Sequence, residues 1–435
     1  MLIQRLTDKL RLQSFGEVAL SALIIGVGCS AEPSLNGRVE QRAERVEGVE
    51  QSSPQLIGKA DEGSSAFPAA RDLALLLPLE DARLRWVDQL PSAWLSEISG
   101  ALERSELGEH ILDESWEEDW RLVSARFTTC QPLGRVAEPE ELDALCWPQL
   151  RLVWQPVIPE LSVTGVVRPW YADDRAIHTL FFAAPEEPEL KAALSLIEGG
   201  SAWRSWSPTA QARFAEARDR VARSLLSDLE ALRGVEGPYE GLEERPELYS
   251  PQAQERFFER LAELLRRRCG AEQLSELTAF SLPLGRNPAA ADLWSFVAFK
   301  AEAGALIQTP LAVRSAETGE ELFAFAESED VTTGHGDAAL DEALEVMPAE
   351  RAAALRAQVI TDTAELPQKV ERINDPYQTT VAHTTCASCH RANNINFNFH
   401  NLSYLEDQAI SVSPRVRADL ERDLKLAEQL WRRSP

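Results

Sequence analysis

The chain has few basic residues relative to its acidic ones. Its 435 residues include 44 lysines and arginines against 70 aspartates and glutamates, which gives a formal net charge of −26. A surface with this balance repels polyanions, so nucleic acid and anionic membrane surfaces are excluded as electrostatic partners. The same acidic excess keeps a protein well solvated, and it permits attraction to a basic partner.

The common catalytic signatures are also missing. The sequence has no Gly-x-Ser-x-Gly, no P-loop, no dinucleotide fingerprint and no His-Glu-x-x-His. Three other patterns resemble sites at first sight, but each has an ordinary structural explanation. His335 is typical of an exposed loop histidine, His178 of a half-buried strand residue, and the acidic run 113–119 of a solvated helix face.

Beyond the N-terminus the chain lacks an apolar run that could span a bilayer, which needs about 20 residues. The N-terminus itself has a short apolar run, 18–28, preceded by three basic residues and followed by Cys29. This arrangement is typical of a secretory signal. We therefore expect a signal peptide over 1–29 and, because the next stretch is polar, a flexible tether over 30–67.

Small residues followed directly by Cys29 resemble the lipobox of bacterial lipoproteins, although Gly26 stands where that family prefers leucine. The resemblance implies that Cys29 is lipidated and becomes the first mature residue. It also implies a cell-envelope protein, lipid-anchored to the outer membrane and facing either the periplasm or the surface.

The rest of the chain predicts an α+β fold, with a mixed helical and antiparallel β body and a mostly helical C-terminal segment. Three segments are expected: an α+β domain over 68–200, a helical segment plus β-meander over 201–331, and a C-terminal segment over 332–435. Ser-Pro pairs that are typical of helix starts predict helices over 207–234, over 250–270 and after 413. Alternating apolar residues predict a strand at 151–157, a hairpin of 166–171 with 176–182 around Asp173-Asp174, and a meander of 293–299, 307–313 and 322–326.

The most specific motif is Cys386-Ala387-Ser388-Cys389-His390. Two thiols three residues apart on one helical turn can each form a thioether with a haem vinyl group, and the next histidine then lies beneath the iron. At this motif the chain resembles cytochrome c. The resemblance implies one covalent haem c, with Cys386 and Cys389 as attachment sites and His390 as axial iron ligand.

The residues 386–406 also look like the C-terminal part of bacterial lipoproteins of unassigned function that carry one such motif. The chain departs from cytochrome c in having only 45 residues after His390 (435 − 390).

The sixth iron ligand is left open because no methionine follows the motif; the two methionines are Met1 and Met347. His400, ten residues after His390, is the favoured ligand. His383, Met347 and an open iron site are the alternatives.

Two other interpretations of the motif remain. His383, Cys386 and Cys389 with His400 or His390 would supply two thiolates and two imidazoles to a structural zinc ion. Alternatively, Cys386 and Cys389 form a plain disulfide.

Three cysteines are not used by these assignments. Cys130 and Cys146 enclose a short loop, so we expect a disulfide between them, with Cys269 left over. Pairing of Cys269 with either of the others stays possible.

The sequence therefore predicts a monohaem lipoprotein that transfers electrons or senses redox state in the cell envelope, with an unidentified redox partner protein. An electron carrier is favoured over an enzyme, because di-haem peroxidases need a second motif. The alternative is a non-redox envelope binding or scaffold protein whose Cys/His site is structural.

Overall fold

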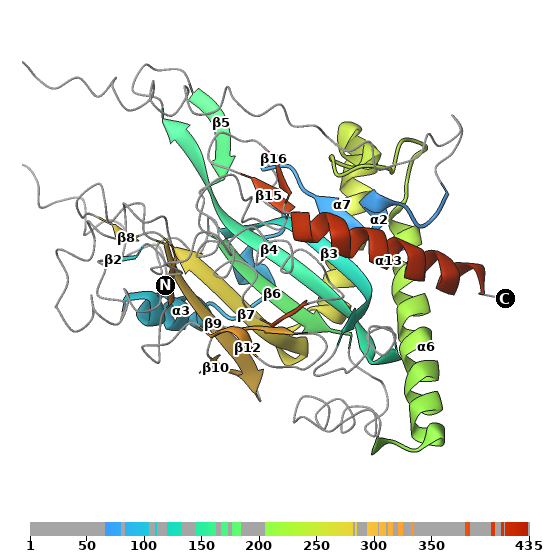
Figure 1. Cartoon of the computed structure of the whole chain (residues 1–435). Helices are drawn as coiled ribbons and strands as arrows, with labels where there is room; N and C mark the ends of the chain where they lie inside the picture. The colour runs from blue at the N-terminus through green and yellow to red at the C-terminus, as the bar shows by residue number, and fades with distance from the viewer. Residues whose placement is uncertain are drawn as a thin grey trace, which may run out of the picture. The chain divides into compact units, whose positions relative to one another are not determined.

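The computed structural model (Figure 1) describes the chain in separate stretches. Residues Glu62–Pro435 form one compact unit, whereas Met1–Asp61 form a second unit that lies outside the described stretches. The predicted signal and tether therefore lie outside them too, apart from the last two tether residues. The described residues are 66–79, 83–103, 109–110, 120–132, 144–161, 167–172, 176–183, 205–281, 283–284, 294–302, 304–309, 312–315, 321–324, 332–334, 379–382, 402–404, 410–412 and 414–433.

A nine-stranded antiparallel sheet forms the centre of the larger unit. Its main path runs in the order β1 (Ala74–Leu76), β3 (Trp120–Pro132), β4 (Cys146–Leu161), β6 (Ala176–Phe182), β7 (Leu274–Ser281), β9 (Trp294–Glu302) and β10 (Ala305–Thr309). Two further strands join it, β5 (Val167–Ala172) on β4 and β13 (Thr332–Gly334) on β9. The predicted segments 68–200, 201–331 and 332–435 thus all contribute strands to one sheet.

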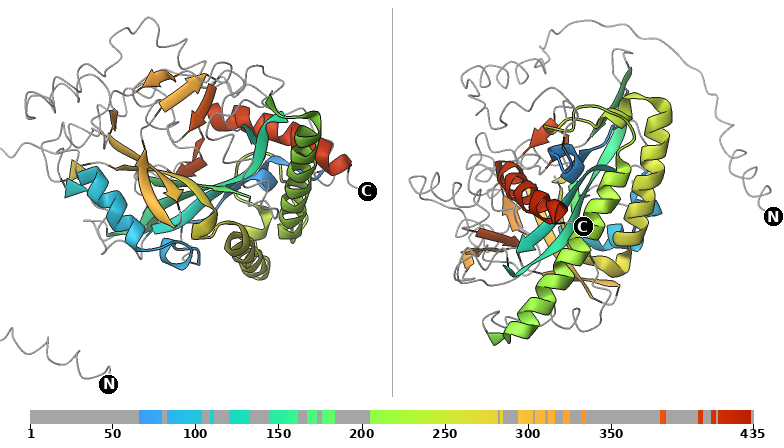
Figure 2. Two further views of the ribbon diagram at one scale, coloured as in Figure 1. Left: turned by 90° about the horizontal axis from the view of Figure 1, so that it is seen from below. Right: turned by 90° about the vertical axis from the view of Figure 1, so that its right-hand side faces the viewer.

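Helices cover both faces of this sheet, which confirms the predicted α+β class. In Figure 2, α7 and α13 lie on opposite faces. Helix α6 packs on β3, β4 and α7, α3 packs on β7 and β9, and α13 packs on β3, α2 and α6. The helices are α2 (Ala70–Leu73), α3 (Ala93–Glu103), α6 (Pro208–Leu232), α7 (Pro251–Arg268) and α13 (Pro414–Arg432), with 3-10 turns η1 (Trp86–Asp88), η4 (Pro246–Tyr249) and η5 (Ala271–Gln273).

Three small antiparallel sheets complete the described elements. One has the order β12 (Glu321–Ala324), β11 (Ala312–Ser315), β14 (Thr379–Ala382). The other two are the pairs β15 (Leu402–Tyr404) with β16 (Ile410–Val412), and β2 (Glu109–His110) with β8 (Pro283–Leu284). Strand β15 packs against β3 and β1, so the chain just before α13 also contacts the edge of the central sheet.

The two long central helices form where the sequence predicts them. Helix α6 starts at Pro208, and the N–H of Ala210 donates to Ser207 Oγ at 3.2 Å, so the side chain satisfies one of the free N–H groups of the first turn. Helix α7 also starts with proline and ends in three arginines, 266–268, whose charge suits the negative end of the helix dipole. Its N-cap residue, Ser250, makes no side-chain capping bond, so proline and amphipathic spacing are enough to define this start.

The predicted hairpin around Asp173-Asp174 is wrong. Strands β5 and β6 do not pair with each other; both run antiparallel to β4, with Val157 opposite Ala172 and Trp154 opposite Ile177. The chain therefore reverses between Leu161 and Val167, and β5 and β6 follow successive parts of one long partner strand. Aspartates tolerate an irregular backbone, but they do not by themselves reverse its direction.

The predicted meander is correct at its first turn and wrong after it. Strands β9 and β10 form a hairpin whose turn includes Gly304, at φ +82°, a conformation that favours glycine. The next predicted strand, 307–313, is divided between β10 and β11, and β11 pairs with β12 and β14 instead of β10. Pro310 stands between the two strands and is a local signal of the interruption, but it does not indicate that β11 pairs with other strands.

The core contains several buried tryptophans, among them Trp86 and Trp154. Trp154 of β4 packs edge-on against Trp86 of η1, with ring centroids 5.4 Å apart, and its Nε1 donates to Thr179 Oγ1 at 3.0 Å. Both indoles are fully buried, so the hydrogen bond removes the cost of burying the Trp154 N–H group.

A buried group of charges joins α2 to the connection between α6 and α7. Arg245 Nε and Nη2 donate to the two carboxylate oxygens of Glu247 at 3.1 and 2.9 Å, and both side chains are fully buried. Arg245 also lies 3.7 Å from Asp72 of α2, which Arg233 Nε contacts at 2.9 Å. Tyr239 donates its hydroxyl hydrogen to Glu247 Oε1 at 2.7 Å.

The pKa values in this cluster are shifted in opposite directions. Burial, together with the hydrogen bond to Glu247, raises the pKa of Tyr239 to about 12. Burial would also raise the pKa of Glu247, but the hydrogen bonds and charge of Arg245 outweigh it and lower that pKa. The carboxylate is thus held ionised, and its contribution to stability is lost only as the pH falls through this lowered value.

Replacing Arg245 by methionine should lower the free energy of unfolding by about 3 kcal/mol or more, because Glu247 is left buried without its charge partner. The measurement is urea unfolding at neutral pH. Arg220→Met is the matched control, since Arg220 is half exposed and lies 3.8 Å from Glu216 on the same helix; it should cost less than about 1 kcal/mol. Equal losses in the two variants would contradict a structural role for the buried cluster.

Candidate functional site

The structure describes three of the cysteines to which the sequence analysis assigned a state. Cys130, Cys146 and Cys269 lie in the described part of the chain. The other predicted site residues lie outside the described part: Cys29, His383, Cys386, Cys389, His390 and His400. Met347, His335 and the acidic run 113–119 lie outside it as well.

Cys130 and Cys146 form a disulfide, in agreement with the sequence prediction. Cys130 stands near the end of β3, and Cys146 is the first residue of β4, opposite Pro132. Their Cα atoms are 4.9 Å apart, a separation that a disulfide spans without moving the backbone. The register between β3 and β4 shifts between Thr128 and Gln131, so the bond lies beside an irregular part of the ladder and closes it covalently.

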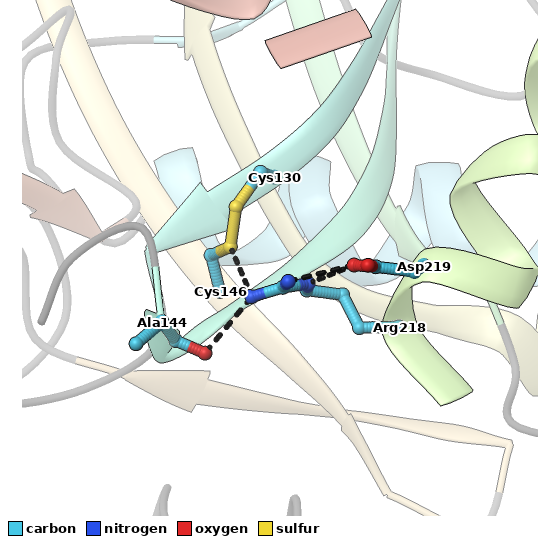
Figure 3. Close-up of a disulfide and its surroundings, with 5 residues drawn as sticks. All are labelled: Cys130, Ala144, Cys146, Arg218 and Asp219. Carbon is cyan, nitrogen blue, oxygen red and sulfur yellow. Dashed lines mark hydrogen bonds and ion pairs between the residues drawn. A yellow bond between two sulfur atoms is a disulfide. The ribbon is translucent and has the colours of Figure 1, made fainter. Parts of the chain in front are cut away.

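One arginine of α6 reaches this disulfide (Figure 3). Arg218 Nη1 donates to the carbonyl oxygen of Ala144 at 3.1 Å and lies 3.8 Å from Cys146 Sγ. Asp219 holds the other side of the guanidinium, accepting from Nε at 2.9 Å and from Nη2 at 2.6 Å. The arginine thereby ties α6 to the start of β4.

The two residues that flank Cys146 in the sequence, Leu145 and Trp147, belong to a small apolar cluster. Trp147 packs against Phe214 at 5.3 Å between ring centroids, and Leu145 and Ala217 complete this small cluster. Cys146 is fully buried and Cys130 is 4% exposed. Thiol–disulfide exchange requires an attacking thiolate to reach a sulfur atom, so this bond is built as a structural link.

Arg218 is not among the residues that the sequence predicts to lie near the disulfide, although one signal of its position was present. Phe214 and Arg218 are four residues apart on α6 and therefore share a helix face. That Phe214 packs on Trp147, next to a predicted disulfide cysteine, could be known only from the tertiary structure.

Cys269 is the unpaired cysteine. It ends α7, is buried, and has a free thiol. Burial raises the pKa of this thiol, which keeps it protonated and unreactive. Its position therefore agrees with the expectation that it is left over when Cys130 and Cys146 pair.

A second group of buried charges lies where α13 meets β3, on the sheet face opposite α7. Arg126 of β3 lies 3.5 Å from Asp419 and 3.8 Å from Asp423, which are one turn apart on α13. Arg415 Nε donates to Asp419 Oδ1 at 2.9 Å. Val416 and Leu420 are buried on the face of this helix that also carries the two aspartates, and this spacing of apolar and acidic residues was a signal that the sequence prediction did not use.

The described residues offer little else that could hold a cofactor. His178 lies in β6, opposite Val153 of β4 and Thr278 of β7, which confirms a strand residue, but its side chain is buried and not half-buried as predicted. Within the described ranges, no three histidine, cysteine, aspartate or glutamate side chains are grouped so that they could hold a metal ion. In the same ranges, no helix has the length and apolar character needed to cross a membrane.

Removing the disulfide should cost about 3 kcal/mol of unfolding free energy, because the bond closes a loop of about 15 residues in the unfolded chain. The variant is Cys130→Ser with Cys146→Ser, and the measurement is urea unfolding without reductant. A thiol reductant should lower the stability of the natural chain toward that of the variant and leave the variant unchanged. A variant as stable as the oxidised natural chain would show that the disulfide does not stabilise the pairing of β3 with β4.

Comparison of the chain with protein-family models, with curated proteins and with solved structures finds no match to any of them.

Proposed function

We propose that the chain is an exported lipoprotein of the bacterial cell envelope that carries one covalently bound c-type haem and transfers electrons or senses redox state. Cys386 and Cys389 are the attachment residues, and His390 is the proximal iron ligand. Cys29 carries the lipid that anchors the protein to the outer membrane, and its redox partner is another protein.

The observation that carries this proposal is the motif Cys386-x-x-Cys389-His390. Two thiols at this spacing and an adjacent imidazole are the donor set that covalent haem attachment requires. When bound, the haem supplies one-electron chemistry. The chain's own residues hold it in place, provide one axial ligand and set the surroundings of the iron.

The disulfide between Cys130 and Cys146 supports export, because disulfides persist in oxidising compartments and are rare in the cytosol. Covalent haem attachment in bacteria takes place outside the cytoplasm as well. Under this proposal all six cysteines have a state: one lipidated, two bound to haem, two in the disulfide, and Cys269 buried as a thiol (1 + 2 + 2 + 1 = 6).

The acidic surface narrows the choice of redox partner. With a formal net charge of −26, the chain favours a docking protein that presents a basic surface. Association should then be faster at low ionic strength, as it is for other electrostatically steered pairs.

Replacing both Cys386 and Cys389 by alanine should abolish haem retention after denaturation, because no thioether position remains, and His390→Ala should change or abolish the iron spectrum. The measurement is visible absorption of each variant, expressed in a host with c-type maturation machinery, before and after denaturation and solvent extraction. Ser388→Ala is the control, since this motif position contributes no donor. Unchanged haem retention and spectra in both variants would refute the assignment, and zinc in place of haem would favour a structural Cys/His site.

His400 is the proposed sixth ligand, so His400→Ala should convert low-spin iron to high-spin iron. Absorption and electron paramagnetic resonance spectra report the spin state directly. His383→Ala is the matched control and should remain low-spin. A low-spin His400→Ala variant would exclude His400, and a high-spin His383→Ala variant would assign the ligand to that residue instead.

A further inference from the structure

We propose that residues 383–401, which carry the Cys386-x-x-Cys389-His390 motif, dock on one face of the central sheet and cover buried polar side chains there. Two neighbouring rows of residues that run across the strands form this surface, which we call the polar face. The inference concerns the path of the segment, and it holds whether its cysteines bind haem, bind zinc or form a disulfide. It gives the body of the protein a role, which is to hold the motif segment.

The first row of the polar face crosses the sheet from β10 to β1. Directly paired residues of an antiparallel sheet point to the same face, so the pairing register identifies the row. His178 of β6 stands at its centre, between Val153 of β4 and Thr278 of β7. From β10 to β1 the row consists of Thr309, Ala298, Thr278, His178, Val153, Ser124 and Leu76.

The second row lies beside the first on the same face, two residues away along each strand, and carries most of the charge. From β10 to β1 it consists of Ile307, Lys300, Glu276, Leu180, Arg151, Arg126 and Ala74. Arg126 contacts α13 through Asp419 and Asp423. Because α13 and α7 lie on opposite sides of the sheet (Figure 2), the polar face is the one turned away from α7.

Polar side chains of the first row are buried. His178 and Thr278 are 5% and 6% exposed, and Ser124 is fully buried, whereas an uncovered sheet face leaves its polar side chains in water. Helix α13 covers the part of the face around Arg126 of β3. The centre around His178 needs a cover too, and this cover has to supply hydrogen-bonding groups, because buried polar groups are satisfied in folded proteins.

The opposite face is already filled at the same place. Thr179 follows His178 on β6 and points the other way, where its Oγ1 accepts from the indole N–H of Trp154 at 3.0 Å. Trp154 in turn packs on Trp86, and these three side chains are fully buried. A segment that crosses the middle of the sheet therefore passes over the polar face.

The two ends of the segment 383–401 lie at opposite ends of the main strand path. Its N-terminal end follows β14, whose Ala382 pairs with Ala312, three residues beyond the end of β10. Its C-terminal end precedes β15, which packs against β1 and β3. Strands β10 and β3 are five spacings apart, about 24 Å, and 19 residues (401 − 383 + 1) span about 60 Å when extended, so the segment is long enough to cross.

Position and composition favour 383–401 over the longer connection 335–378 as the cover. The connection 335–378 follows β13, which pairs with β9, and precedes β14, which pairs with β11, so it has no need to cross the sheet. It also contains nine acidic residues, whereas 383–401 contains none and has five asparagines and three histidines. Neutral amide and imidazole groups can donate to and accept from the polar face without burying an unpaired carboxylate.

Photo-cross-linking in the full-length protein tests the docking. With p-benzoylphenylalanine in place of Leu180, a half-buried residue of the second row, mass spectrometry of the tryptic digest should find cross-links to 383–401. The same substitution at Glu259, which is exposed on α7, is the control and should give no cross-link to that segment. Cross-links from position 180 to 335–378 or to another part of the chain, with none to 383–401, would overturn the proposal.

Lysine acetylation is a second test that leaves the polar face itself unaltered. Lys300 is a half-buried residue of the second row, whereas Lys425 is exposed on α13. Replacing 383–401 by a glycine-serine linker of equal length should raise the acetylation rate of Lys300 several-fold and leave that of Lys425 unchanged. An unchanged rate at Lys300 in the folded variant would contradict the docking. Neither test detects haem, so a failure of the haem proposal would leave both expected results as they are.

Discussion

The ladder between β3 and β4 is the constraint on which the other contacts of the fold depend. Its closed end carries the Cys130–Cys146 bond, its apolar face carries Trp154 in the tryptophan core, and its opposite face presents Arg126 to α13. These contacts fall on different faces because side chains alternate along a strand. A slip of one residue would move Arg126 to the apolar face, so pairing register and charge placement support each other.

Buried charge is concentrated at the two places where distant parts of the chain meet the body. Arg245 and Glu247 join the α6–α7 connection to Asp72 near the start of the described chain, and Arg126 joins the final helix to the sheet. In each case an unpaired partner would be costly, so the clusters favour one arrangement of the segments over loosely packed alternatives.

Local signals in the sequence predicted the parts of the fold that local physics determines. The starts of α6 and α7, the turn at Gly304 and the disulfide all follow from short patterns. The reversal after Leu161 and the division of 307–313 between two sheets depend on which strand pairs with which, and composition does not encode this. Both charge clusters join residues far apart in sequence, so local patterns could not predict them. The haem motif lies outside the described residues, so its assignment stays a prediction from the sequence.

The central claim is that haem is bound covalently at Cys386 and Cys389, and a pyridine haemochrome spectrum of the denatured, solvent-extracted natural protein tests it most directly. The protein should come from a host with c-type maturation machinery. Haem that stays with the chain and gives the α-band of a thioether-linked haem is the expected result. A haem-free chain from a competent host would contradict the account and leave an envelope protein with a structural Cys/His site.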